Sequence, residues 1–322
     1  MRFGVLLPTY SPERLDYKTA MVIRDFAVRA ERLRFDSLWV ADHMLSAPGM
    51  FGGSCLSPLL CLSHAAAVTE RVRLGTSILI LAIRNPVMVA KDLATLDALS
   101  SGRLVLGAGV GWNPHVFGVA GVPRAERGSR TDEALTVIRR LLSEPSITHR
   151  GKHYTFENVG VTPRPPVLPA IWIAGGAEPA QPRIAPSVLR RITAADGWIA
   201  RARASNAMIK EDWRQISEEL ARQGRRRSGF TFAHLNFLHV VPGTDRDEVL
   251  ACQRPVFEKA MGTQRSWEQL QQSHLTGTTS EIIERIRDLE RAGLEEMILC
   301  PLDYDAEQLE RYAEGIMPHF CN

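Results

Sequence analysis

Short apolar segments alternate with helical patterns along this chain, and that alternation limits the available folds more than any other feature. Eight apolar segments of strand length occur in its 322 residues, an order typical of parallel β-α units. Eight is the number of units that closes a barrel. We therefore predict an α/β fold, a (β/α)8 TIM barrel, with a doubly wound open sheet as the alternative. The expected strands are Phe3–Leu7, Ser37–Val40, Val72–Leu81, Arg103–Leu106, Ala170–Ala174, Trp198–Ala200, Phe230–Val241 and Met297–Cys300.

Local signals place several helices between these strands. Asn85 followed by Pro86 predicts an N-cap and first turn. Ser129 with Asp132, and Thr278 with Glu281, resemble capping boxes. A hairpin-like segment at residues 147–156 interrupts the rhythm between the fourth and fifth strands. We therefore expect residues 1–322 to form a single barrel domain with an insertion between strands 4 and 5.

Charge and composition exclude several classes of protein. The 39 basic and 36 acidic residues give a net charge of +3, spread along the chain, so nucleic acid is not an expected partner. The apolar run at residues 78–83 is far too short to cross a membrane. The N-terminus lacks the layout of a signal peptide, and the five cysteines form no CxxC pair. These features predict a cytoplasmic protein with reduced thiols and no membrane contact.

Familiar catalytic and metal-binding motifs are missing from the sequence. The nine histidines include no HExxH spacing, and no GxSxG or Walker A sequence occurs. We therefore expect no metal site, and a serine hydrolase or P-loop enzyme is disfavoured.

In a barrel, the active site is built at the carboxyl ends of the strands, where this chain places Asp42 and His43. A histidine there titrates near neutral pH and can exchange a proton with a bound ring or carbonyl. The alternative is a histidine that only holds structure together.

Glycines cluster at two further strand ends. Gly109 and Gly111 predict close approach of a flat ring or, equally, a tight turn. A dinucleotide fingerprint requires a helix to start at once, and we expect none for about eighteen residues. Gly175 and Gly176 offer bare amides that could hold a phosphate before a helix near Pro186; a contact from Arg183 is a weaker expectation.

Taken together, these strand ends resemble the bacterial-luciferase-like superfamily of flavin and deazaflavin oxidoreductases. The resemblance implies a barrel with the flavin at its mouth, its phosphate at the Gly175-Gly176 turn, a non-proline cis peptide near Ser77-Ile78, and His43 at the position of proton transfer. The stretches that carry it are residues 37–43, 74–78, 90–107, 109–113, 127–133 and 171–176. The cofactor-binding residues it implies are Asp42, Ser77, Ile78, Ile80, Gly109, Val110, Gly111, Trp112, Gly175 and Gly176.

The resemblance leaves two chemistries open. We expect a monooxygenase that uses reduced FMN from a partner flavin reductase to oxygenate a small organic substrate, with the insertion and residues 48–53 as a lid. The alternative is hydride transfer by coenzyme F420, with His43 as acid or base. Trp112 stands where some deazaflavin dehydrogenases have a catalytic glutamate, so a sugar-phosphate dehydrogenase is not expected. Similar proteins are homodimers, and we expect the same here.

Two hypotheses from other classes also stay open. A non-catalytic flavin-binding protein is one. The other is a lyase or isomerase that holds a substrate phosphate at Gly175-Gly176, since fold does not determine function.

Overall fold

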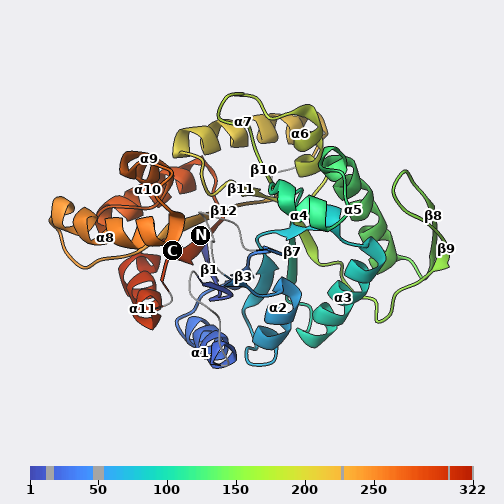
Figure 1. Ribbon diagram of the computed structural model, residues 1–322, viewed down its shortest axis with the longest axis horizontal. Coiled ribbons are helices and arrows are strands. Elements are labelled where there is room, and N and C mark those ends of the chain that lie inside the picture. Colours follow the sequence, from blue (N-terminus) through green and yellow to red (C-terminus); the bar gives the residue numbers. More distant parts are fainter. Residues whose placement is uncertain (12–17, 46–53, 226–227, 304, 321–322) are drawn as a thin grey trace.

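A closed ring of parallel strands lies at the centre of the molecule, with helices around it (Figure 1). The computed structural model describes residues 1–11, 18–45, 54–225, 228–303 and 305–320. Strand β10 pairs with β7 and so joins the two sides of the sheet, which confirms the barrel and excludes the open doubly wound sheet. The strands, in spatial order, are β10 (Ala170–Gly175), β11 (Gly197–Ala200), β12 (Thr231–Leu238), β13 (Glu296–Pro301), β1 (Arg2–Leu6), β3 (Ser37–Val40), β5 (Arg73–Thr76), β7 (Leu104–Gly109) and β6 (Leu79–Ile80).

The third predicted strand is split into two pieces. β5 ends at Thr76 and β6 begins at Leu79, and both pair with β7. Between them lies a cis peptide bond at Ser77-Ile78, as the resemblance implied. Gly107 on β7 faces this break: a Cβ at residue 107 would lie 1.8 Å from the carbonyl oxygen of Thr76. The bare glycine backbone therefore allows the two strands to approach where β5 leaves the sheet.

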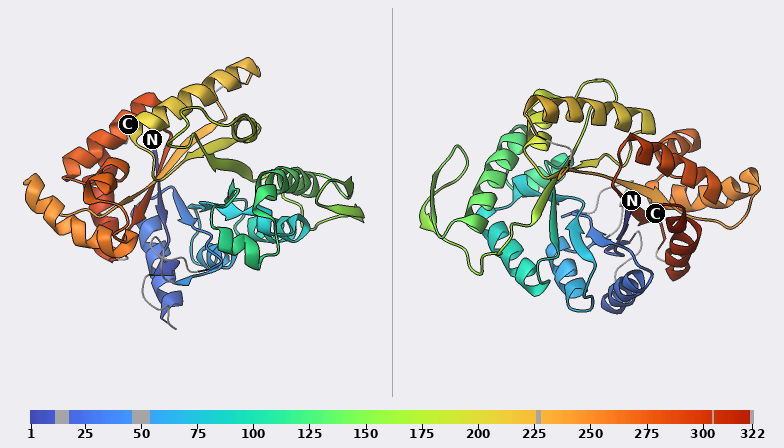
Figure 2. Two further views of the ribbon diagram at one scale, coloured as in Figure 1. Left: turned by 45° about the horizontal axis from the view of Figure 1, so that its top comes forward. Right: turned by 180° about the vertical axis from the view of Figure 1, so that it is seen from behind.

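Helices cover the outside of the ring in both views of Figure 2. Asn85 caps α3, and Thr278 with Glu281 forms a capping box, both as predicted. None of the described helices is long and apolar enough to cross a lipid bilayer. The helices are α1 (Thr19–Arg32), α2 (Pro58–Ala66), α3 (Pro86–Leu99), α4 (Pro114–Val119), α5 (Arg127–Ser143), α6 (Pro186–Thr193), α7 (Asn206–Arg222), α8 (Arg246–Met261), α9 (Trp267–Ser273), α10 (Thr279–Ala292) and α11 (Ala306–Gly315).

Two expectations about helices were wrong. Ser129 does not cap a helix, because α5 already begins at Arg127 and the Ser129 hydroxyl bonds the carbonyl of Glu126. A helix also begins directly after the glycines of β7: α4 starts at Pro114 and is capped by Asn113. The expected absence of a helix was therefore the wrong reason to exclude a dinucleotide-binding fold. The closed barrel excludes that fold instead.

The predicted insertion is a two-stranded hairpin, β8 (Ile147–Arg150) with β9 (Thr155–Val159). It projects from the barrel beside α5 (Figures 1 and 2). The carboxylate of Glu133 on α5 anchors it by accepting from His149 Nε2 and from the amides of His153 and Tyr154. The hairpin is thus held against the outside of the barrel. The other expected lid segment, residues 48–53, lies outside the described residues.

Large apolar side chains fill the barrel interior. Trp39 and Trp172 pack with their ring centroids 5.3 Å apart, within a cluster that also contains Leu6, Val105 and Ile298. This layer closes the interior, so a ligand can enter only at an end of the barrel.

Candidate active site

A cavity of about 280 Å³ opens at the carboxyl ends of the strands. Most of its lining is apolar, and no described residue that lines it is acidic. An outer cavity of about 430 Å³ shares part of its wall, including Trp112 and Arg203. The inner lining residues are Leu6, Ala41, His43, Ser77, Ile78, Trp112, Ala174, Ile199, Ala200, Arg201, Ala202, Arg203, Leu235 and Phe237. The two cavities form one continuous site with an apolar floor and a cationic rim.

His43 is the predicted catalytic residue, and it lines the inner cavity. Burial lowers the pKa of its imidazole, and the neighbouring charge of Asp42 opposes this effect. A neutral imidazole can accept a proton at one ring nitrogen and donate from the other. His43 is therefore suited to act as a base or acid near neutral pH.

Asp42 fixes the backbone that follows the cavity wall at Ile78. Its carboxylate accepts from the amide of Ile80 at 2.9 Å and pairs with Arg84 at 2.9 Å, and only 5% of Asp42 is exposed. These contacts fix β6 immediately after the cis peptide. Asp42 and Ile80 are thus bonded to each other, and neither is among the residues that line the inner cavity.

Ser77, Ile78 and Trp112 line the cavity together with His43. Gly109 lies against the Ile78 side chain, since a Cβ at residue 109 would come within 2.8 Å of it. Gly111, at φ +75°, packs in the same way against Ile80 and Phe117, and Val110 between them is half-buried. The glycines thus make room for the bulge at Ile78.

A side chain of α7 packs against the turn of Gly175 and Gly176. Both carboxylate oxygens of Asp212 on α7 accept from the amide of Ala177, at 3.1 and 3.2 Å. A Cβ on Gly176 would lie 2.2 Å from Asp212 Oδ2. Burial raises the pKa of Asp212 to about 6, although the Ala177 amide and Arg201 oppose the shift. A carboxylate thus lies against Gly176 and takes the next amide along, beside the turn where a phosphate was expected.

Arg201 and Arg203 follow β11 directly and line both cavities. The Nη2 of Arg201 donates to the carbonyl of Ala177, and its Nη1 bonds Glu178 at 3.2 Å. Burial lowers the pKa of Arg203. Neither arginine was singled out from the sequence, although both directly follow the expected strand Trp198–Ala200, which ends where β11 ends.

A buried hydrogen-bonded chain lies behind this wall. Because Arg265 can only donate, Nε2 of His274 must accept from it, and His274 Nδ1–H then donates to Asn236 Oδ1. Asn236 Nδ2 donates to His234 Nε2, and His234 Nδ1–H donates to the carbonyl of Ala200. The direction is the same at every link. Both imidazoles are therefore neutral, and the chain ends on the last residue of β11.

The inner cavity fits a flat, uncharged ring system. Its wall of Ile78, Ile199 and Leu235 is apolar, and His43 supplies a group that can exchange protons. The side chains of Arg201 and Arg203 line the outer cavity at its rim. No group of three or more candidate metal ligands occurs among the described residues. The residues present therefore suit a flavin-type cofactor.

Fold and cavity together define a (β/α)8 barrel with a ligand site at its carboxyl-terminal mouth. The sequence pattern of the luciferase-like monooxygenase family matches residues 1–296, and the chain belongs to this family.

Several individual proteins are similar to the chain. An F420-dependent glucose-6-phosphate dehydrogenase of Intrasporangium calvum is 28% identical over 91% of this chain and 93% of its own length. The corresponding protein of Kineococcus radiotolerans is 37% identical over 51% of each chain. Among solved structures, an F420-dependent secondary alcohol dehydrogenase in complex with an F420-acetone adduct has a TM-score of 0.82, with 21% identity over 100% of this chain and 99% of its own. The monooxygenase RslO1 from Streptomyces bottropensis has the same TM-score, with 22% identity over the whole of both chains.

Proposed function

We propose that the protein is an oxidoreductase that binds coenzyme F420 in the inner cavity and exchanges hydride with a small organic substrate. The observation that carries the proposal is the apolar cavity with a neutral histidine on its wall. The F420-dependent relatives support this alternative over the FMN-dependent monooxygenase that we ranked first from the sequence.

The substrate is expected to be small and uncharged where it reacts. Leu6, Ile199, Leu235 and Phe237 contribute apolar lining, and an apolar wall with few polar groups favours neutral organic ligands. An alcohol or its carbonyl counterpart fits these properties. Trp112 lines the cavity where some deazaflavin dehydrogenases have a catalytic glutamate, so we expect no turnover of glucose 6-phosphate.

Each residue has a defined task in the proposed reaction. A bound deazaflavin would supply a hydride acceptor or donor. His43 would take the hydroxyl proton of an alcohol as the hydride leaves, or return it to a carbonyl in the reverse direction. Asp42 positions the bulge that backs the ring by holding Ile80 and Arg84. Trp112, 51% exposed at the mouth, would limit the access of water.

The test is a fluorescence titration of the apoprotein with coenzyme F420 and, separately, with FMN, each oxidised and reduced. Preferential binding of F420 is the expected result. Preferential binding of reduced FMN would favour the monooxygenase instead, which would require a flavin reductase as its partner. Binding of neither would refute the proposal, and turnover of a sugar phosphate without a flavin would favour a lyase or isomerase.

A further inference from the structure

Side chains of α7 bond both ends of the segment that follows β10. Asp212 accepts from the amide of Ala177 at the start of the segment. One turn further along α7, Gln215 accepts from the amide of Ile184 at 3.0 Å and donates to the carbonyl of Pro182 at 3.0 Å. The protein thus satisfies the polar groups at both ends of this segment itself.

A phosphate at the amide of Ala177 would have to displace Asp212. Only 2% of Asp212 is exposed, and the absence of a side chain on Gly176 is what lets it approach. Two negative groups at one amide would repel each other, since like charges at this separation destabilise the ionised forms. The turn therefore already contains its own anion.

Cationic groups lie beside this turn, at the rim of the mouth: Arg201 donates to the carbonyl of Ala177, and its Nε lies 3.4 Å from where a Cβ of residue 176 would be. Arg201 and Arg203 line the outer cavity together with Trp112 and Glu178. The Nε of Arg201 is buried and has no hydrogen-bond partner. Glu178, which pairs with Arg201, has a side chain that is 71% exposed. An exposed ion pair is worth at most about 1 kcal/mol, so a ligand anion can replace this carboxylate at little cost.

We propose that Arg201 and Arg203 form the subsite for the negatively charged group of the ligand, a phosphate or carboxylate, and that Asp212 keeps the Gly175-Gly176 turn out of ligand binding. The inference builds on the proposed function, because it assumes a ligand whose ring lies in the inner cavity. Two sources of the anion are consistent with this chemistry: the phosphate-bearing tail of the cofactor, or an anionic group of the substrate.

The experiment compares two ligands that differ only in the tail. Coenzyme F420 and its deazaflavin core without the phosphate-bearing tail are titrated by fluorescence into the wild-type protein and into Arg203→Gln. Loss of one charge-assisted contact weakens binding by about tenfold. We expect this loss for the intact coenzyme and none for the core.

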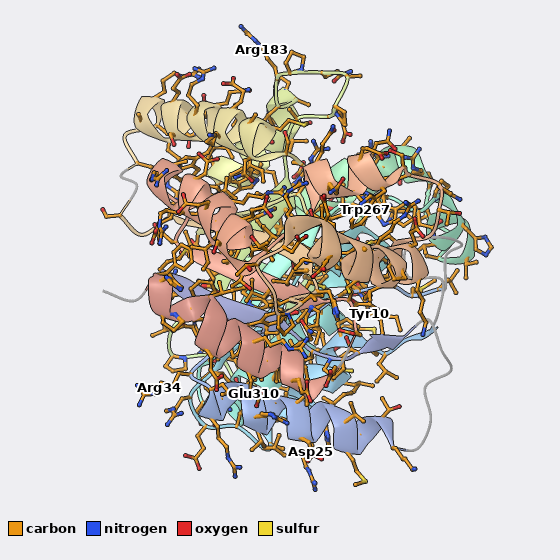
Figure 3. All side chains as sticks on the ribbon, turned by 90° about the vertical axis from the view of Figure 1, so that its left-hand side faces the viewer. Tyr10, Asp25, Arg34, Arg183, Trp267 and Glu310 are labelled. Carbon is orange, nitrogen blue, oxygen red and sulfur yellow. The ribbon has the colours of Figure 1, made fainter. Side chains whose placement is uncertain are left out.

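Three further variants sharpen the result. Glu178→Gln removes the competing carboxylate, so the affinity for the coenzyme is expected to rise by about two- to fivefold. Asp212→Asn keeps an acceptor for the Ala177 amide. We therefore expect the ratio of the affinity for intact coenzyme F420 to the affinity for its core to stay the same. Arg183→Gln is the matched control, because Arg183 is exposed and points away from the body of the molecule (Figure 3).

Inorganic phosphate distinguishes the source of the anion. If phosphate raises the melting temperature of the wild type but not of Arg203→Gln, while the coenzyme-to-core ratio is unchanged, the subsite serves the substrate. The inference is wrong if Arg203→Gln changes neither the coenzyme-to-core affinity ratio nor the rise in melting temperature with phosphate. It is also wrong if Asp212→Asn strengthens binding of the intact coenzyme but not of the core. Failure of both coenzyme and core to bind would instead refute the proposed function.

Discussion

Two buried histidines, His234 and His274, are held neutral by their surroundings. Burial lowers the pKa of His234 to about 4 and that of His274 to about 3, from 6.5. Nearby arginines add to the shift for His274, with Arg265 the largest of them. In addition, each Nε2 is already used as an acceptor, so protonation would break a link of the chain.

These shifts predict acid destabilisation. Between pH 6.5 and about 3 the unfolded chain binds more protons than the folded protein, so stability is full above pH 6.5 and falls as the pH is lowered. Each histidine contributes a slope of up to about 1.4 kcal/mol per pH unit. Urea unfolding of the wild type and of His274→Gln between pH 4 and 8 checks this. An equal slope in both proteins would contradict it.

His43 supports a second prediction at the same scale. His43→Asn removes the proton acceptor, so kcat should fall by about 10²- to 10⁴-fold while binding of coenzyme F420 is retained. In the wild type, the acid limb of the pH profile of kcat should have its midpoint below 6.5, because burial lowers the pKa of His43. His64→Asn, on α2, is the matched control. Equal losses in binding and turnover would show that His43 only holds structure together.

Individual residues could be predicted only where strand ends were located correctly. His43, Ser77, Ile78 and Trp112 line the cavity as their place at strand ends suggested. The closure of the Gly175-Gly176 turn depends on a residue of α7, 35 positions away along the chain. A contact between such distant residues leaves no local pattern, although two arginines directly after an apolar strand would have been a usable signal.

At the scale of elements, Gly107 determines how β5 and β7 meet. Gly107→Ala would place a Cβ 1.8 Å from a backbone oxygen that cannot move independently. We expect a loss of at least about 3 kcal/mol in the free energy of unfolding, the upper range for overpacking. Gly118→Ala is the control, because nothing lies within 4 Å of its Cβ and alanine favours the helix by up to about 1 kcal/mol. Denaturation midpoints measure both, and a neutral Gly107→Ala would contradict the argument.

Periodicity recovered the order of strands and helices but not their interruptions. The apolar run at residues 72–81 has no signal that marks the break between β5 and β6, because both pieces are apolar. Helix α4 is only six residues long and has Pro114 at its start. Helix α8 contains Pro255, which normally argues against a helix interior. Short or proline-containing elements depend on tertiary contacts more than on local pattern.

At the scale of the whole molecule, three large apolar side chains are exposed on neighbouring helices. Met21 on α1, Leu60 on α2 and Met88 on α3 are 56%, 72% and 68% exposed, and α2 contacts both α1 and α3. Exposed apolar surface that extends over neighbouring elements is typical of interaction sites. We propose that a second copy of the chain covers this face.

Light scattering coupled to gel filtration tests the proposed homodimer. The wild type is expected to have the mass of a dimer, and Leu60→Glu that of a monomer, because a charge in the interface would be buried without a partner. Val167→Glu, at a residue that is 78% exposed and outside these helices, should remain dimeric. A monomeric wild type would contradict the proposal.

The buried chain from Arg265 to Ala200 also constrains how related sequences can diverge. Arg265 donates at its start, and His274, Asn236 and His234 each accept from one neighbour and donate to the next. Replacing Asn236 alone would leave one histidine without its acceptor and the other without its donor. Substitutions at positions 234, 236, 265 and 274 should therefore be correlated among related sequences. A related sequence should keep all four residues or replace them together.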